Sequence, residues 1–186
     1  YGISICKRGW QRSPSNKTEL RFLTFAGPMP TIHLTTFIAQ SAEIVFDLSR
    51  HVGLHKDAMV AYREEAVAGT RFGLLESGET ITWRSRHFFK DRLMRLRVLE
   101  LVKPERYVLE QAMGPFAEFR HERHVKPCEN GSILINLIHY EWPQGRLGRI
   151  ADRLYLGNYL ENLIQQHNET IRKSAEGNRW KTYLMK

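Results

Sequence analysis

The chain has 186 residues, 42% of them hydrophobic and 26% charged, and a formal net charge of +8. This composition is typical of a globular domain and excludes fibrous and disordered classes, and no apolar run approaches the length of a membrane span. A chain of this length favours a single domain with one core.

The positive charge lies at the two ends of the chain. Residues 1–30 and residues 171–186 each contain five basic residues and one acidic residue, and together they account for the whole net charge. The body between them is therefore neutral and lacks the basic surface that binds a nucleic-acid backbone. We expect no nucleic-acid partner.

The two cysteines, Cys6 and Cys128, are too far apart in the sequence to form a CxxC pair. So low a cysteine count in a chain of this length favours a reducing compartment. Residues 1–6 are too short and too polar to be the hydrophobic core of a secretory signal peptide. These observations predict a cytoplasmic protein.

Residues 1–30 show neither helical nor alternating periodicity, and Lys, Arg, Ser, Asn and Pro are scattered through them. We expect them to form an N-terminal extension outside the domain, with Met29 as the natural start. The domain is expected to span residues 31–176, and residues 177–186 are expected to form a basic tail.

Regular patterns begin at residue 31. Apolar and polar residues alternate over residues 31–38, which predicts a strand. Ser41 is a suitable N-cap for a helix whose short apolar stripe ends near Arg50. His51–Met59 is expected to form a second short helix or a turn, broken at Gly53.

Six further segments have the composition of strands and are separated by turn-like residues. Short links of this kind join antiparallel neighbours, whereas parallel strands need long crossovers, so the segments predict an antiparallel meander. They are Ala61–Val67, Glu79–Phe89, Arg92–Leu101, Tyr107–Met113, Phe116–Val125 and Ser132–Glu141.

The period becomes helical after Pro143, which predicts one long amphipathic helix from Leu147 to Ile171. Gly157 lies on its apolar face and indicates a close approach to the sheet or a slight bend. Together the elements predict an α+β fold in which a curved antiparallel sheet wraps around the C-terminal helix. Because one helix cannot cover the whole concave face, we expect a cavity between them.

Four segments share their pattern with one known superfamily. They are SAEIVFDLSR at Ser41–Arg50, GETITWRSRHFF at Gly78–Phe89, GPFAEFRHERHV at Gly114–Val125 and YEWPQGRLGRIADRLYLGNYL at Tyr140–Leu160. Together they resemble the polyketide cyclase/dehydrase-like branch of the SRPBCC superfamily, the START-like helix-grip proteins. The resemblance implies the helix-grip fold and a hydrophobic cavity. Carriers, cyclases, hydrolases and regulators all occur in the superfamily, so the fold alone does not fix a function.

Alternation along the strands selects the side chains that face this cavity. Glu79, Trp83 and His87 share one face of their strand, and we expect it to be the inner face because the other face has Arg84 and Arg86. The alternation therefore predicts a cavity wall with one tryptophan and two titratable groups.

Two later strands contribute the remaining candidates. Phe119 and His121 are expected to face inward, and Arg123, which shares their parity, would then lie near the rim. On the last strand both faces are apolar, and the resemblance favours Asn136 and Tyr140 as inward residues. The candidate ligand-binding residues are Glu79, Trp83, His87, Phe119, His121, Asn136, Tyr140 and Leu154.

His87, His121 and Tyr140 are the candidate catalytic residues, because a histidine that titrates near neutral pH suits general acid or base chemistry. In the alternative interpretation each of them satisfies a buried hydrogen bond or lies at the rim. No metal is expected, since His121 and His124 are three strand positions apart and point to opposite faces. No cofactor is expected either, because nucleotide-binding motifs are absent from the sequence.

Three functions remain open at this point. The first is the binding of a hydrophobic small molecule, which could be aromatic, polyketide-like or acyl. The second is an enzyme of the aromatase/cyclase or isomerase kind that uses His87 or His121 as base and Tyr140 as hydrogen-bond donor. The third is a protein-interaction or regulatory module.

Overall fold

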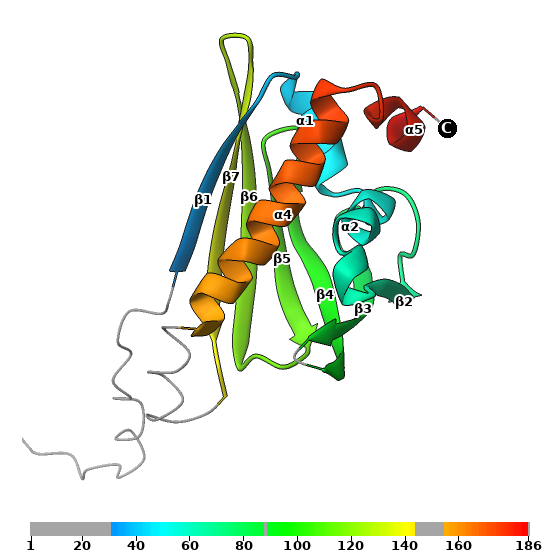
Figure 1. Cartoon of the computed structure of the whole chain (residues 1–186), viewed down its shortest axis with the longest axis vertical. Coiled ribbons are helices and arrows are strands. Elements are labelled where there is room, and N and C mark those ends of the chain that lie inside the picture. Colours follow the sequence, from blue (N-terminus) through cyan, green and yellow to red (C-terminus); the bar gives the residue numbers. More distant parts are fainter. Residues whose placement is uncertain (1–30, 88, 144–154, 186) are drawn as a thin grey trace, which may run out of the picture.

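The computed structural model describes residues 31–87, 89–143 and 155–185. Its core is an antiparallel seven-stranded sheet with the strand order β1-β7-β6-β5-β4-β3-β2 (Figure 1). The sheet is thus a meander from β2 to β7, and β1 extends it as an edge strand by pairing with β7. The strands are β1 Thr31–Ile38, β2 Glu65–Gly69, β3 Thr80–His87, β4 Lys90–Val102, β5 Arg106–Met113, β6 Glu118–Cys128 and β7 Gly131–Glu141.

The predicted strands agree with this sheet except at the first of the six. There η1, a 3-10 helix over Val60–Tyr62, precedes β2, and Arg63 adopts a left-handed conformation with φ of 51°. A left-handed residue cannot continue a strand, so β2 begins only at Glu65. The expected strand at Ala61–Val67 is therefore correct only in its second half.

The helices follow the predicted order. Two short helices, α1 Ala42–Ser49 and α2 Val52–Ala58, join β1 to the meander, and α4 Gly157–Glu176 and α5 Trp180–Leu184 follow it. No helix in the described ranges is both long and apolar enough to cross a membrane.

Gly53 does not break α2, contrary to the sequence-based expectation. The side chain of His51 caps this helix by accepting a hydrogen bond from the backbone N–H of Leu54 at 3.2 Å. A β-carbon on Gly53 would lie only 3.1 Å from the His51 ring. Gly53 is therefore explained by the room that the capping side chain needs.

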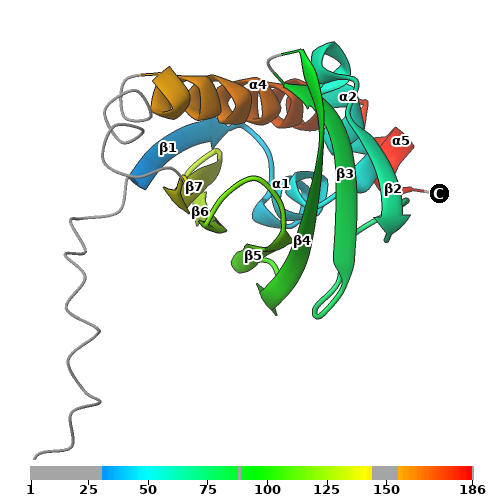
Figure 2. The ribbon, with the colours of Figure 1, turned by 90° about the horizontal axis from the view of Figure 1, so that it is seen from below.

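The sheet is strongly curved, and α4 lies across its open side (Figure 2). Irregularities in strand pairing contribute to the curvature, because an extra residue in one strand bends it and increases its twist. They occur between Ala66 and Ala68 in β2 and twice along β4. This confirms the predicted α+β fold, a curved antiparallel sheet around a long C-terminal helix.

The two halves of α4 are buried to different degrees. In the C-terminal half His167, Ile171 and Ala175 are fully buried against the sheet and α1. In the N-terminal half Leu160 and Ile164 are only half-buried. The part of the predicted helix that includes Leu147, Ile150 and Leu154 lies outside the described residues.

Gly157 lies against β7, as its place on the apolar stripe predicts. A β-carbon at this position would come within 3.2 Å of the hydroxyl of Tyr140. Because Tyr140 is itself 1% exposed, a larger side chain at position 157 would have to displace packed atoms.

The C-terminal segment contains α5, although the sequence places it in a basic tail. Trp180, Tyr183 and Leu184 pack against the main hydrophobic core. The hydroxyl of Tyr183 also donates a hydrogen bond to the carboxylate of Asp57 in α2 at 2.5 Å. These contacts make α5 part of the packed body.

Candidate functional site

A cavity of about 180 Å³ lies between the concave face of the sheet and the N-terminal half of α4. The half-buried state of that part of the helix follows from this, because its side chains cover a hollow instead of packing against the strands. The lining is mostly apolar and includes Trp83, Leu96, Phe119, Ile138, Leu160 and Ile164.

Strand alternation places several candidates at the cavity wall, as expected. Trp83 and His87 of β3 line the cavity, and so do Phe119 and His121 of β6. Thus four of the eight candidate ligand-binding residues are brought together around one hollow.

Arg123 is not at the rim, contrary to expectation. It lines the cavity next to His121, yet it is only 4% exposed. Its guanidinium donates hydrogen bonds to the hydroxyl of Tyr107, the backbone carbonyl of Ser49 and the side-chain carbonyl of Asn136, the last at 3.1 Å. Alternation correctly gave its face, and its depth follows from its contacts with Ser49 at the end of α1 and with Tyr107 of β5.

The same guanidinium reaches α4. Its Nη2 donates to Nδ1 of His167 at 3.2 Å, and Nε2 of His167 has no hydrogen-bond partner among the described residues. Burial lowers the pKa of His167 and of His121 well below the usual value, and the charge of Arg123 lowers both further. Both imidazoles are therefore neutral at neutral pH.

A chain of amides continues this network across the core. The side-chain carbonyl of Asn136 lies 2.9 Å from Nε2 of His121 and accepts a hydrogen bond from it. The Asn136 amide then donates to Asn168 of α4, which in turn donates to the hydroxyl of Thr36 in β1. Asn136 is fully buried in this network, and the lining of the cavity does not include it.

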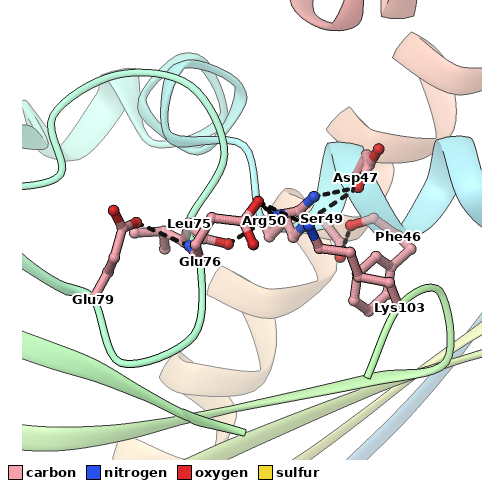
Figure 3. Close-up of polar contacts among 8 residues, drawn as sticks. All are labelled: Phe46, Asp47, Ser49, Arg50, Leu75, Glu76, Glu79 and Lys103. Carbon is pink, nitrogen blue, oxygen red and sulfur yellow. Dashed lines mark hydrogen bonds and ion pairs between the residues drawn. The ribbon is translucent and has the colours of Figure 1, made fainter. Parts of the chain in front are cut away.

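Arg50 is a second buried arginine in the cavity wall. Unlike Arg123, it has acidic partners (Figure 3). Its guanidinium contacts the carboxylate of Asp47 at 2.7 Å and that of Glu76 at 2.9 Å. The ammonium of Lys103 also contacts Glu76 at 2.9 Å. The charge of Arg50 is thus neutralised by neighbours, although the residue is as buried as Arg123.

Glu79 does not line the cavity. Its carboxylate accepts a hydrogen bond from the backbone N–H of Glu76 at 2.9 Å and closes the turn before β3 (Figure 3). The strand begins only at Thr80, so the alternation that places Trp83 inside does not extend to Glu79.

Tyr140 faces inward on β7 but lies beside the cavity. It is buried in a second apolar cluster with Ile32 and Ile138, under Gly157. Leu154 lies outside the described residues.

The cavity end near the β3–β4 hairpin has a second polar group of residues. Nδ1 of His87 lies 2.6 Å from the hydroxyl of Tyr159 in α4, and the ring of Tyr62 stacks on His87. Burial lowers the pKa of His87, and burial together with Tyr62 and Glu64 raises the pKa of Tyr159 to about 12. The phenol therefore keeps its proton and the imidazole is neutral, and the tautomer of His87 sets which of the two donates.

His55 of α2 connects the two polar groups. Its Nε2 lies 3.3 Å from the carboxylate of Glu64, whose side chain is 12% exposed. Its ring also contacts the rings of Trp83 and His167. In the described ranges no three His, Cys, Asp or Glu side chains form a cluster that could bind a metal ion.

Arg123, Tyr159 and Glu64 are among the polar residues of the cavity wall that sequence reasoning missed. The signal for Arg123 was available in its shared parity with Phe119 and His121. Tyr159 lies one position before Leu160 on the predicted helix, where it still reaches the cavity. Glu64 follows η1 in an irregular segment, and nothing in the local pattern marks it as buried.

No protein-family model and no curated protein matches the chain by sequence. Solved structures match its fold. Protein TTHA0849 of Thermus thermophilus is 16% identical, with a TM-score of 0.62 over 78% of this chain and 99% of that one. A START superfamily protein from Mycobacterium smegmatis is 12% identical, with a TM-score of 0.55 over 82% of this chain and 98% of that one. The chain has the same helix-grip fold as these structures.

A plant protein has the same helix-grip fold. Major latex-like protein 151 of Panax ginseng is 12% identical, with a TM-score of 0.61 over 81% of this chain and 100% of that one. At such identities the likeness concerns the fold alone. What the helix-grip cavity does in this chain must be argued from its own side chains.

Proposed function

We propose that this chain binds an apolar small molecule in the cavity between the sheet and the N-terminal half of α4. The observation that supports the proposal most strongly is the mostly apolar cavity of about 180 Å³. An apolar cavity of roughly 150 Å³ is large enough to bind a benzene ring, so a ligand with at least one ring or a short acyl chain fits.

The wall supplies both affinity and orientation. Transfer of a ligand from water to a surface formed by Trp83, Phe119 and Leu160 contributes about 25 cal/mol for each Å² of apolar area buried. The polar groups at the two ends of the cavity, around His87 and around Arg123, are arranged to fix the position of the ligand.

Binding is tested with N-phenylnaphthylamine, a neutral apolar dye whose emission increases in apolar surroundings. We expect saturable binding to the wild-type protein at one site per chain. The replacement Leu160→Trp fills the cavity from α4 and should weaken binding by about tenfold or more. The matched control Asn162→Trp adds the same side chain on the exposed face of the same helix and should leave the affinity unchanged.

Equal affinities for Leu160→Trp and Asn162→Trp would show that the dye binds elsewhere and would contradict the proposal. Absence of any saturable binding to the wild-type protein would contradict it as well. Thermal melting of both variants shows whether each has kept its fold.

An acid–base enzyme is the second candidate function, and the pairing of His87 with Tyr159 favours it. In the tautomer whose Nδ1–H donates to the Tyr159 hydroxyl at 2.6 Å, the neutral imidazole of His87 has a free Nε2, which is suited to remove a proton from a carbon next to a carbonyl. Such chemistry would give an isomerase- or cyclase-like activity.

The probe for this activity is β-tetralone, an apolar ketone whose exchange of α-protons in deuterated water can be followed by NMR. In the enzyme hypothesis the wild-type protein accelerates exchange, and His87→Gln loses about 10²-fold or more of the acceleration. The variant should still bind N-phenylnaphthylamine. Equal exchange rates with the wild-type protein and with His87→Gln would exclude His87 as the base.

A further inference from the structure

We propose that the ligand of this cavity is an acid, and that its anionic group lies against the guanidinium of Arg123 at the α1 end. This inference rests on the proposed function, because it requires a ligand in the cavity. It adds the chemical class of the ligand, an apolar body with one carboxylate or a similar anion.

The charge of Arg123 has no counter-charge among the described residues. The groups within hydrogen-bond distance of it are a backbone carbonyl, a phenol, an amide and two imidazoles, from Ser49, Tyr107, Asn136, His121 and His167. None of these groups is an anion. A buried charge that has lost its water and gained no opposite charge is unfavourable, so the arrangement suits a site that an anion completes.

The other charged groups of the cavity wall have partners or lie elsewhere. Arg50 is neutralised by Asp47 and Glu76. The carboxylate of Glu64 contacts the imidazole of His55 at 3.3 Å. Arg92 lies over the ring of Trp142, at the end of the wall near the hairpin. Arg123 is therefore the group in the described wall whose charge most clearly lacks compensation.

The guanidinium is also placed to receive a ligand. Arg123 is 4% exposed and contributes to the cavity lining, together with His121 and Tyr107. Its Nη2 has two N–H bonds, and the described residues provide one acceptor, Nδ1 of His167. The other N–H is free to donate to a carboxylate in the cavity, and such charge-assisted bonds are roughly twice as strong as neutral ones.

A purely structural role gives a different expectation. The guanidinium joins α1, β5, β7 and α4 through neutral acceptors, and this network alone would give the cavity no preference between charged and neutral ligands. The two interpretations are therefore distinguished by ligand charge at constant ligand shape.

Naphthoate and naphthamide are the matched probes, since they differ in a carboxylate and an amide of almost the same size. Their affinities are measured by displacement of N-phenylnaphthylamine at pH 7.5 and low salt. We expect the wild-type protein to bind naphthoate about tenfold or more tightly than naphthamide. Arg123→Met should reduce this preference to less than about twofold. The control Arg92→Gln, which removes the cation at the hairpin end, should retain it.

A second variant covers the case in which Arg123→Met does not fold. Asn136→Asp places a carboxylate at the position of an amide that already contacts Arg123 at 3.1 Å. The amide of Asn168 can turn to donate to it. Because the new carboxylate neutralises the charge of Arg123, this variant should lose the preference for naphthoate. Its affinity for naphthamide should stay within about twofold of that of the wild-type protein.

The outcomes separate this inference from the proposed function. If the dye binds in the cavity but the wild-type protein binds both naphthalene probes equally, the proposed function stands and the inference that the ligand is an acid is wrong. Loss of the preference in Arg92→Gln would place the anion at the other end and would also overturn the inference. If neither the dye nor naphthoate binds, the proposed function is wrong, and the inference with it.

Discussion

At the scale of single residues, the core of this protein includes three groups that rarely occur together in an apolar interior. His121 and His167 are buried neutral imidazoles, and Arg123 between them is a buried cation. The guanidinium disfavours protonation of the two histidines, because protonation of either one would add a second positive charge beside it. The charge state of this cluster therefore depends on pH.

The cluster predicts that acid destabilises the fold. Burial, and then the charge of Arg123, lower the folded-state pKa of His121 and His167, whereas in the unfolded chain both take up protons near pH 6.5. Below that pH the unfolded state binds more protons, so the free energy of unfolding falls by about 1.4 kcal/mol per pH unit for each histidine until its folded-state pKa is reached. Urea unfolding at pH 7.5 and pH 5.5 measures the effect.

Variants assign the pH dependence to the buried imidazoles. His167→Gln keeps an acceptor for Arg123 and removes one titrating group, so its stability should depend less steeply on pH. The control His33→Gln changes an exposed histidine of β1 and should behave as the wild-type protein does. A slope for His167→Gln equal to that of the wild-type protein would contradict the assignment.

Residue-level features were only partly predictable. Alternation gave the inward faces of β3 and β6, because side chains on a strand must point to opposite sides of the sheet. On β7 both faces are apolar, and the resemblance supplied the inward face. Alternation does not show how deeply a side chain is buried. It therefore predicts Arg123 at the rim and Tyr140 in the cavity wall, and both predictions are wrong. It also could not show that Glu79 belongs to a turn, because that depends on where pairing with β4 begins.

At the scale of elements, α4 combines a packed half and a half that covers a hollow. The predicted apolar stripe runs through both, since helical periodicity depends on which face is buried and not on what lies beneath it. Only the curvature of the sheet distinguishes the halves. Irregular pairings of β2 with β3 and of β4 with β5 contribute to that curvature, and the sequence does not mark them.

The two halves should respond differently to truncation. Ile171 is fully buried, so Ile171→Ala should cost about 2–5 kcal/mol, the sum of lost burial and a new cavity. Leu160 borders an existing cavity, and Leu160→Ala should cost only about 1 kcal/mol while changing ligand affinity. Urea unfolding measures both costs, and equal losses would show that the N-terminal half is packed as tightly as the C-terminal half.

At the scale of the whole molecule, the cavity is a consequence of how the sheet and the C-terminal helix pack as two layers. A single curved sheet with one apolar face has one long helix to cover it, and the helix is too narrow for the whole face. A hollow remains, with one polar group of residues around His87 and another around Arg123. The order and type of elements predicted this architecture, because meander links and a change of period are local signals.

The most direct test of the central claim is a crystal structure of the wild-type protein with N-phenylnaphthylamine. We predict that the rings of the dye lie in the cavity, between Trp83 and Phe119 on the sheet and Leu160 on α4. A dye bound only on the outer surface, or a core in which side chains fill the space beneath the N-terminal half of α4, would contradict the account.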